Sequence, residues 1–340
     1  MDISVIIPCF NDRKTLSGCI ESVLKATTGT SAEIIVIDDG SSDGCEDIVR
    51  QYDGVRLIRT AHSGASYARN RGLTESKGDF ITFLDADDEF CCFSDHFAGT
   101  IDLMRKKGYD AVSTDYIRRD IRSGKETVIR SGLHGEEELN DQDTSFTAFF
   151  TPGSICYVWN KVYRRDFLKK NHIAFRNLPY AEDRDFNAAV VLKGAKIFFS
   201  DEVTTVYHFD PLKKTPLVYK CFADQSVRLF KAADREKSLV YLYQAAYTVL
   251  LGLFFECSGK SIETKERLIR AALKDRRLFR AVRVLSVYPS GSSGQKFMRM
   301  GMETVSRLLL RNRVKETALI FSLAEHNRIA ARHSPAGKRS

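Results

Sequence analysis

The chain has 340 residues, of which 43% are hydrophobic and 28% charged, with only 7 prolines and 21 glycines. This composition is that of a globular protein with a sizeable core, and it excludes collagen-like, low-complexity and wholly disordered chains. Charge is distributed unevenly, because residues 1–210 hold 26 Lys and Arg against 34 Asp and Glu, whereas residues 211–340 hold 26 against 10. The net charges of −8 and +16 favour two regions with different partners.

The first 115 residues alternate short apolar runs with helical patterns. Strands are predicted over Ile3–Pro8, Glu33–Asp38, Val55–Arg59 and Phe80–Leu84, and helices over Leu16–Leu24 and Gly64–Ser76. Apolar strands that do not alternate with polar residues, separated by helices, are typical of a mostly parallel sheet with helices on both faces. The sequence therefore predicts an α/β, doubly wound fold, whose ligands bind outside the carboxyl ends of the strands.

The pattern is looser after residue 110. Lys125–Arg130 and Lys196–Phe209 are predicted strands, and Glu182–Lys193 is a predicted helix between them. From Pro211 onward only helical periodicity is visible, interrupted by the linker-like segment Pro289–Gly294. We expect two domains: residues 1–210 with the sheet, and residues 211–340 as an all-helical region.

Eight cysteines are present without any CxxC pair, and the N-terminus lacks the basic and apolar segments of a secretory signal. We therefore expect free, buried thiols and a cytoplasmic protein.

The segment Asp85-Ala86-Asp87-Asp88 directly follows the strand Phe80–Leu84. Alternation along an extended chain brings the carboxylates of Asp85 and Asp87 near each other, where they repel unless a cation neutralises them. Mg²⁺ or Mn²⁺ with phosphate oxygens is the usual occupant of such an oxygen-rich site. Spacing alone leaves a solvated acidic turn as the alternative.

Three further segments accompany this acidic one: Val5–Asn11, Asp38–Ser41 and His62–Gly72. Together, in their order and spacing over residues 1–115, the four resemble family 2 inverting glycosyltransferases of the GT-A fold, of the bacterial cell-surface polysaccharide type. The resemblance implies a nucleotide-sugar donor, a uridine diphosphate sugar in particular, bound with Mn²⁺ or Mg²⁺.

The same resemblance assigns donor-binding roles at the first two strands. Pro8, Phe10 and Asn11 would line the nucleotide pocket. Asp39 would read the base, because a carboxylate can accept the imide N–H of uracil. The alternative for Asp39 is turn and cap chemistry, which Asp-Gly-Ser also serves.

His62 and Arg69 match the positions that contact the nucleotide and the diphosphate in the family, near a helix start that itself attracts anions. Asp85 would approach the ribose or the sugar and, with Asp87, the metal. Without the family context, Arg69 and Arg71 could equally be solvated surface residues.

Transfer with inversion needs a base that takes the proton of the acceptor hydroxyl on the side opposite the leaving diphosphate. Ala181-Glu182-Asp183, before an amphipathic helix, resembles the Glu-Asp motif that carries this base, so Asp183 is the candidate base and Glu182 would orient Asp183 or the acceptor. The alternative is structural, because acidic residues are favoured at any helix start.

Two more positions come from the resemblance. Lys161, in Trp159–Arg164, matches a lysine near the donor or acceptor, and His208 lies where several members have a further metal or diphosphate contact. A neutral imidazole can bind Mn²⁺, although a lone His after a strand is more often a core or surface residue.

Ser238–Phe255 contains no Lys, Arg, Asp or Glu over 18 residues. Gln244, Gly252 and several tyrosines favour a buried helix packed on the catalytic domain, with an interfacial or a membrane-spanning helix as alternatives.

Arg276–Leu285 and Gln295–Arg313 are basic amphipathic patterns. They suit an anionic lipid surface, which would make the protein peripheral on the inner face of the cell membrane, and equally a helical bundle with a solvated basic face or an oligomer contact. Nucleic acid is disfavoured, because stacking aromatics are not interleaved with the cations.

We therefore predict a glycosyltransferase that extends a glycan or a lipid-linked glycan. A dinucleotide-dependent oxidoreductase is excluded, because Pro8–Asp12 replaces the GxGxxG turn that it needs. A catalytically degenerate nucleotide-sugar-binding scaffold protein is the alternative.

Overall fold

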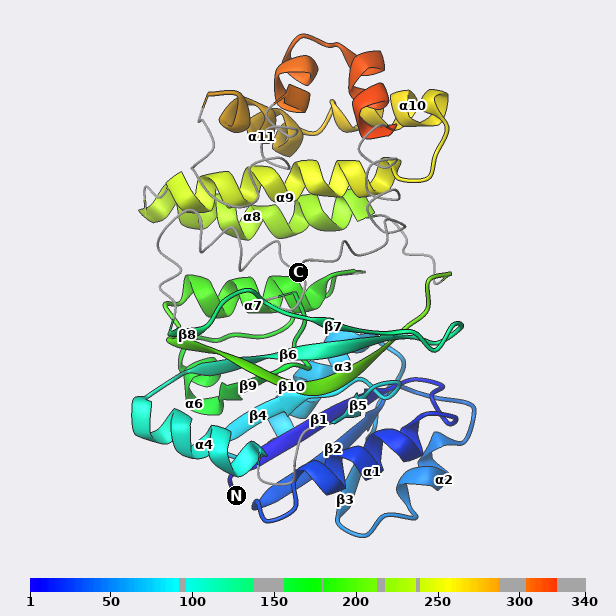
Figure 1. Cartoon of the computed structure of the whole chain (residues 1–340), viewed down its shortest axis with the longest axis vertical. Helices are drawn as coiled ribbons and strands as arrows, with labels where there is room; N and C mark the ends of the chain where they lie inside the picture. Colours follow the sequence, from blue (N-terminus) through cyan, green and yellow to red (C-terminus); the bar gives the residue numbers. More distant parts are fainter. Residues whose placement is uncertain are drawn as a thin grey trace, which may run out of the picture. The chain divides into compact units, whose positions relative to one another are not determined.

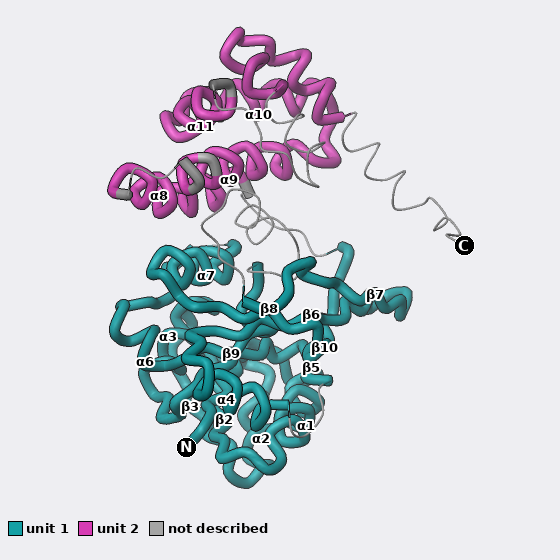
Figure 2. Tube along the Cα trace, turned by 60° about the vertical axis from the view of Figure 1, so that its left-hand side comes forward, with its two compact units in different colours: residues 1–214 teal, residues 215–340 magenta. Residues whose placement is uncertain are grey.

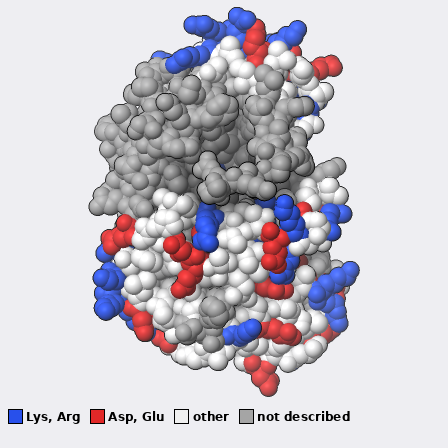
Figure 3. Space-filling model, viewed as in Figure 1, with Lys and Arg blue, Asp and Glu red and all other residues white. Residues whose placement is uncertain are grey.

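The computed structural model describes residues 1–91, 96–136, 156–178, 180–212, 218–236, 239–287 and 304–322 (Figure 1). It divides into two compact units, Met1–Lys214 and Thr215–Ser340 (Figure 2). On the visible face of the first unit, Lys and Arg are interspersed with Asp and Glu (Figure 3).

The first unit is an α/β structure. Its strands are β1 (Ile3–Cys9), β2 (Ala32–Asp38), β3 (Val55–Arg59), β4 (Phe80–Phe83), β5 (Glu89–Phe90), β6 (Ala111–Asp120), β7 (Glu126–Ile129), β8 (Gly135–Glu136), β9 (Lys161–Arg164) and β10 (Ile197–Phe209). Its helices are α1 (Leu16–Ala26), α2 (Cys45–Val49), α3 (Ala65–Glu75), α4 (His96–Lys107), α6 (Arg165–Lys170) and α7 (Glu182–Leu192). The predicted fold class is confirmed, and the predicted strands and helices before residue 210 are present within one or two residues of their expected ends.

All ten described strands belong to one sheet, in the order β3-β2-β1-β4-β9-β6-β10-β5, with β7 paired to β6 and β8 to β10. The strands β1, β2, β3 and β4 are parallel, and β6 is parallel to β10. Strand β9 is antiparallel to both β4 and β6, so β4 and β6 run in the same direction. The carboxyl ends of β1, β2, β4, β6 and β10 therefore share one edge of the sheet.

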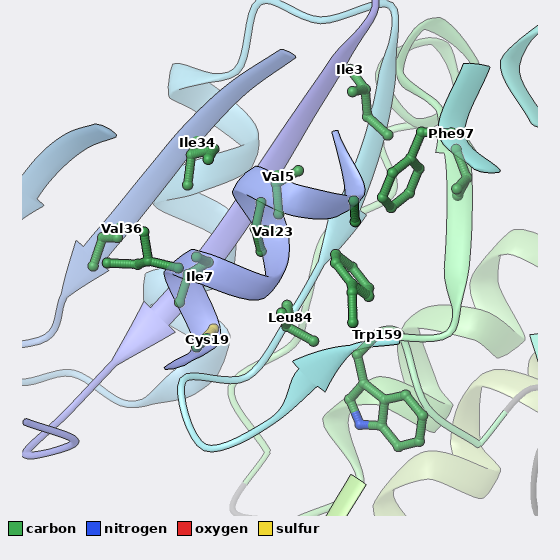
Figure 4. Packing of buried hydrophobic residues seen from close by; sticks show 14 of the residues in the cluster. Ile3, Val5, Ile7, Cys19, Val23, Ile34, Val36, Leu84, Phe97 and Trp159 are labelled. Atoms are coloured by element: carbon green, nitrogen blue, oxygen red, sulfur yellow. The ribbon is translucent and has the colours of Figure 1, made fainter. Parts of the chain in front are cut away.

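Helices cover both faces of this sheet (Figure 1), and the alternation of side chains along β1 explains how. Ile3, Val5 and Ile7 belong to the core cluster that includes residues of α1 and α4 (Figure 4). Ile6 points to the other face, where Gly72 of α3 approaches so closely that a Cβ at position 72 would lie 2.3 Å from Ile6 Cγ2. Buried apolar strands thus anchor helices on both sides, and the loops at the carboxyl edge remain available for polar side chains.

Local patterns did not predict α4, β6 or β9. Of these, β9 has the most unexpected place in the sheet. It contributes only four residues, yet it lies between β4 and β6 and reverses direction relative to both. Five of the seven described cysteines are buried, as predicted, whereas Cys91 is exposed and Cys156 is partly exposed. Cys92 lies outside the described residues.

The second unit is helical where it is described, with α8 (Val218–Glu236), α9 (Leu239–Cys257), α10 (Ile262–Ala272), α11 (Arg276–Val287) and helical segments over 304–310 and 314–322. Residues 239–255 of the charge-free stretch fall in α9, whose residues 244–250 are buried within this unit. Gly252 permits close contact with α8, because a Cβ there would lie 2.6 Å from Phe222 Cβ. Among the helices with described residues, none is long and apolar enough to cross a membrane. The predicted linker Pro289–Gly294 and the first part of 295–313 lie outside the described residues.

Candidate active site

Polar and aromatic side chains follow the strands at the carboxyl edge of the sheet. At the end of β1, Asn11 adopts a left-handed backbone conformation with φ 58. Its backbone N–H donates to Ser41 Oγ at 2.9 Å, and its Oδ1 accepts the backbone N–H of Ser42 at 2.9 Å. The loops after β1 and β2 are therefore joined, which places Pro8, Phe10 and Asn11 beside the Asp38–Ser41 turn.

Phe10 and His62 form a stacked pair at this edge. Their ring centroids are 4.0 Å apart with an interplanar angle of 20°, and Phe10 is 42% exposed although it is a large apolar residue. An exposed aromatic face held by a second ring is suited to stacking against a planar ligand group.

The carboxylate of Asp39 is buried and heavily hydrogen-bonded. It accepts the backbone N–H groups of Ser63 at 2.9 Å and Gly64 at 2.7 Å, and the hydroxyl of Thr60 at 3.2 Å. His62 Nδ1 lies 3.0 Å from the same carboxylate. Asp39 thus holds the loop that enters α3, in which Gly64 has φ 94, and the expectation that it reads a base stays a prediction.

Asp85, Asp87 and Asp88 follow β4 and form a cluster in which one ligand oxygen from each lies within 4.8 Å of the others. Asp88 is the buried member, and its Oδ1 accepts the backbone N–H of His208 at 2.8 Å. Three hard oxygen donors this close repel one another, so the set fits Mg²⁺ or Mn²⁺ chemically. Sequence reasoning named Asp85 and Asp87 as ligands; Asp88 is an addition from the structure.

His208, at the end of β10, lies beside this cluster rather than within it. Its Nδ1 is 3.8 Å from Asp88 Oδ1 and has no hydrogen-bond partner among the described residues. Its Nε2 lies 3.2 Å from the guanidinium of Arg119, at the end of β6. Arg119 was missed by sequence reasoning because no local motif surrounds it, and a metal-binding role for His208 stays a prediction.

Arg69 is the centre of the site. It is 3% exposed, and its guanidinium donates to Asp85 Oδ1 and to Glu182 Oε1, both at 2.7 Å. The same group makes an ion pair with Asp183 at 3.1 Å. Burial alone would lower the pKa of Arg69, but the three carboxylates raise it well above its ordinary value, so the cation persists.

The alternative interpretation as a solvated surface residue is thus wrong for Arg69 and confirmed for Arg71, which is exposed and pairs with Glu75 one helical turn away. Because Arg69 is occupied by carboxylates, its predicted contact with a diphosphate stays a prediction.

Asp183, in the first turn of α7, is buried beside Arg69. Burial raises its pKa to about 7, while the charge of Arg69 acts in the opposite direction. Its Oδ2 accepts the backbone N–H of Val158 at 3.3 Å, and α7 has no side-chain cap hydrogen bond at its N-cap, Ala181. The N-cap residue thus supplies no cap, although Glu182, Asp183 and Asp185 in the first turn still suit the helix dipole. A carboxyl group whose pKa is raised to about 7 is also suited to general base chemistry.

Lys161 is buried next to this group rather than exposed at the donor edge. Its Nζ donates to Tyr157 O at 2.8 Å and to Asn160 Oδ1 at 2.7 Å, and burial lowers its pKa to about 7. Tyr157 is also 5.6 Å from Tyr207, centroid to centroid. Tyr157 precedes β9 and Tyr207 belongs to β10, and nothing in their local sequence indicates that they come together.

Residues 4–171 match the family model described as Glycosyl transferase family 2. The chain is 26% identical over 233 residues to the uncharacterized glycosyltransferase EpsJ of Bacillus subtilis (strain 168), covering 66% of each chain. It is 33% identical over 177 residues to the uncharacterized glycosyltransferase YibD of Escherichia coli (strain K12), covering 51% of each. The chain therefore spans about half to two thirds of the length of these curated relatives.

The fold is similar to that of the solved structure of Staphylococcus aureus TarS 1–349 in complex with UDP-GlcNAc. The TM-score is 0.72 at 18% sequence identity, and the match covers 96% of this chain and 92% of that one. The similarity extends over the α/β unit and the helical part of the chain.

Proposed function

Because the chain belongs to glycosyl transferase family 2, whose model its residues 4–171 match, we propose that it is a metal-dependent, inverting glycosyltransferase. It moves a sugar from a nucleoside-diphosphate donor, a UDP-sugar, to a hydroxyl group of a glycan or lipid-linked glycan of the cell surface. Residues 1–210 carry the reaction, in the cytoplasm at the inner face of the cell membrane, and residues 211–340 supply acceptor, membrane or oligomer contacts.

The donor pocket is proposed at the carboxyl edge of β1, β2 and β4. The TarS structure that this fold resembles was solved with UDP-GlcNAc, which supports a UDP-sugar here. The exposed Phe10–His62 pair would stack on the base, with Pro8, Asn11 and Asp39 around it. Asp85, Asp87 and Asp88 would hold the cation, with His208 beside them. When bound, a divalent cation neutralises the charge that develops on the leaving diphosphate.

Asp183 is proposed as the general base. It would take the proton from the acceptor hydroxyl, while Glu182 orients the acceptor and Lys161 fixes the adjacent backbone through Tyr157 O. The observation that carries this assignment is the single buried guanidinium of Arg69, which contacts Asp85 on the donor side and Asp183 on the base side. The carboxylates of Asp85 and Asp183 are thereby held on the same guanidinium, close enough to act on one bound donor and acceptor.

A donor screen tests the function. Nucleotide sugars are incubated with the protein and Mn²⁺, and release of free nucleotide is measured; transfer to glycan acceptors is then followed with the donor identified. We expect Asp183→Asn to reduce turnover by about 10²- to 10⁴-fold, the usual contribution of a general base. The exposed Asp53 is the matched control, since Asp53→Asn makes the same chemical change away from the site.

Retained turnover in both Asp183→Asn and Asp87→Ala would refute the site assignment. Calorimetric binding of UDP without turnover of any donor would instead support the non-enzymatic alternative, a nucleotide-sugar-binding scaffold.

A further inference from the structure

The helices of the second unit form two layers. The long helices α8 and α9 lie side by side, and α10, α11 and the helical segments 304–310 and 314–322 lie together on one side of them in both views (Figures 1 and 2). We call these later helices, with their connections from Lys260 onward, the outer layer. They are held by buried residues such as Leu278, Leu285 and Leu309.

The exposed charges of the outer layer are almost all positive. Among its described residues, ten Lys and Arg are exposed, whereas Glu263 is the one exposed acidic residue. Several of these cations are visible at the upper end of Figure 3. No ion pair is described for Arg276, Arg307 or Arg311 with any part of the chain that the structure places. Such a concentration of one charge attracts an anionic partner.

Helix α11 shows how the charges are arranged. Arg276, Phe279 and Arg283 recur at i, i+3 and i+7, so they lie along one face of the helix. Arg280, beside them, is only partly exposed and pairs with Asp234 of α8. Residues at the opposite positions, such as Leu278, are buried. The Arg283 guanidinium lies 5.9 Å from the centroid of the Phe279 ring, and Phe279 is 54% exposed.

The same combination of cation and exposed apolar side chain recurs on the next two helical segments. Leu310 is 42% exposed between the exposed Arg307 and Arg311, and Leu319 is 41% exposed one turn after the exposed Lys315. Exposing apolar side chains of this size to water is unfavourable. At a lipid surface they would enter the acyl boundary, while the arginines would meet the head groups.

We propose that the outer layer binds the surface of an anionic lipid bilayer. The exposed cations would meet the anionic head groups, and the exposed Phe279, Leu310 and Leu319 would enter the acyl boundary beside them. A nucleic acid fits less well, because Phe279 is the one exposed aromatic ring among the described residues of this layer, and leucines offer a base nothing to stack on. Binding of this kind would hold the proposed transferase next to lipid-linked acceptors.

The test uses the full chain and sedimentation with vesicles of phosphatidylcholine, with or without phosphatidylglycerol. We expect binding only to the anionic vesicles, weakened by added salt. The triple variant Arg276→Gln, Arg307→Gln, Arg311→Gln should bind about a hundredfold more weakly, since each cation near an anionic surface contributes about fivefold. The matched control replaces three exposed cations of α8, Lys220, Lys231 and Arg235, by Gln and should lose far less.

A second variant separates lipid from other polyanions. The double variant Leu310→Ser, Leu319→Ser keeps every charge and should still weaken binding to anionic vesicles several-fold. It should have no effect on binding of a labelled single-stranded RNA, because a leucine offers a base nothing to stack on. Equal affinity for both kinds of vesicle, an equal loss in the α8 control, or tighter binding to RNA than to vesicles would overturn the assignment. Vesicle binding needs neither donor nor turnover, so Asp183→Asn should bind vesicles like the parent protein. The membrane proposal and the proposed transferase activity can therefore fail independently of each other.

Discussion

Asp183→Asn removes a carboxylate that the folded protein holds at a cost in stability. The pKa of this group is 3.8 in its ordinary state and about 7 in the folded protein, because Asp183 is buried. Between these two pH values the folded chain binds the proton and the unfolded chain does not. The contribution of this group to the free energy of unfolding therefore falls as the pH rises from about 4 to about 7. Roughly three pH units at 1.36 kcal/mol each correspond to about 4 kcal/mol.

Asparagine does not titrate, so the variant escapes this loss. We expect the difference in the free energy of unfolding, variant minus parent, to be smallest near pH 4 and to increase by about 4 kcal/mol toward pH 8. Turnover should be lost in the same variant. Asp183→Asn would therefore be more stable toward pH 8, relative to the parent protein, and inactive.

The assay is urea unfolding at a series of pH values in the presence of EDTA. The fluorescence of Trp159 reports on the first unit, because it is the one tryptophan of the chain and is buried there. Asp53→Asn is the control, and its effect should not depend on pH. A difference between Asp183→Asn and the parent protein that stays constant from pH 4 to pH 8 would refute the raised pKa of the buried Asp183.

Three further changes have definite outcomes. Arg69→Met removes a cation that lowers the pKa of Asp183. The acid limb of the pH profile of kcat/KM should therefore move to higher pH by about one to three units, and Arg69→Lys should move it by a smaller amount. An acid limb that stays at the same pH in Arg69→Met would contradict the role of Arg69. Asp87→Ala should weaken Mn²⁺ binding in calorimetry and lower turnover, because it removes one of three clustered carboxylates; unchanged Mn²⁺ affinity would count against the metal site. Gly72→Ala places a Cβ 2.3 Å from Ile6 Cγ2 and should cost about 1–3 kcal/mol in urea unfolding, whereas Gly99→Ala, with no atom within 4 Å, should not destabilise; equal effects would show that the α3–β1 contact is not tight.

Much of the site edge could be predicted without coordinates. The apolar runs 3–8, 33–38 and 80–84 lack alternation, which indicates buried parallel strands, and parallel strands bring their carboxyl ends to one edge. The residues after those runs, such as Phe10, Asp39 and Asp85, therefore had to lie near one another. Their order along the chain was sufficient to indicate the family, and the family model matches residues 4–171.

The contacts that give the site its chemistry were beyond this reasoning. Arg69 lies 113 residues from Glu182 in sequence, and their side chains meet only because the first half of α3 lies beside the start of α7 in the fold. Likewise, Lys161 became a buried group because β9 lies between β4 and β6, and His208 approached Asp88 rather than Asp85 or Asp87.

Local periodicity and turn chemistry thus determined, from the amino-acid sequence alone, most strands and helices of the first 90 residues and the polar residues that follow the strands there. The tertiary structure alone decided which charges share a buried space, that Asp183 is paired with Arg69 instead of capping its helix, and which cations of the outer layer remain exposed. The physical reason is that periodicity reports interactions between neighbours in sequence, whereas burial and Coulomb energy depend on distances set by long-range packing.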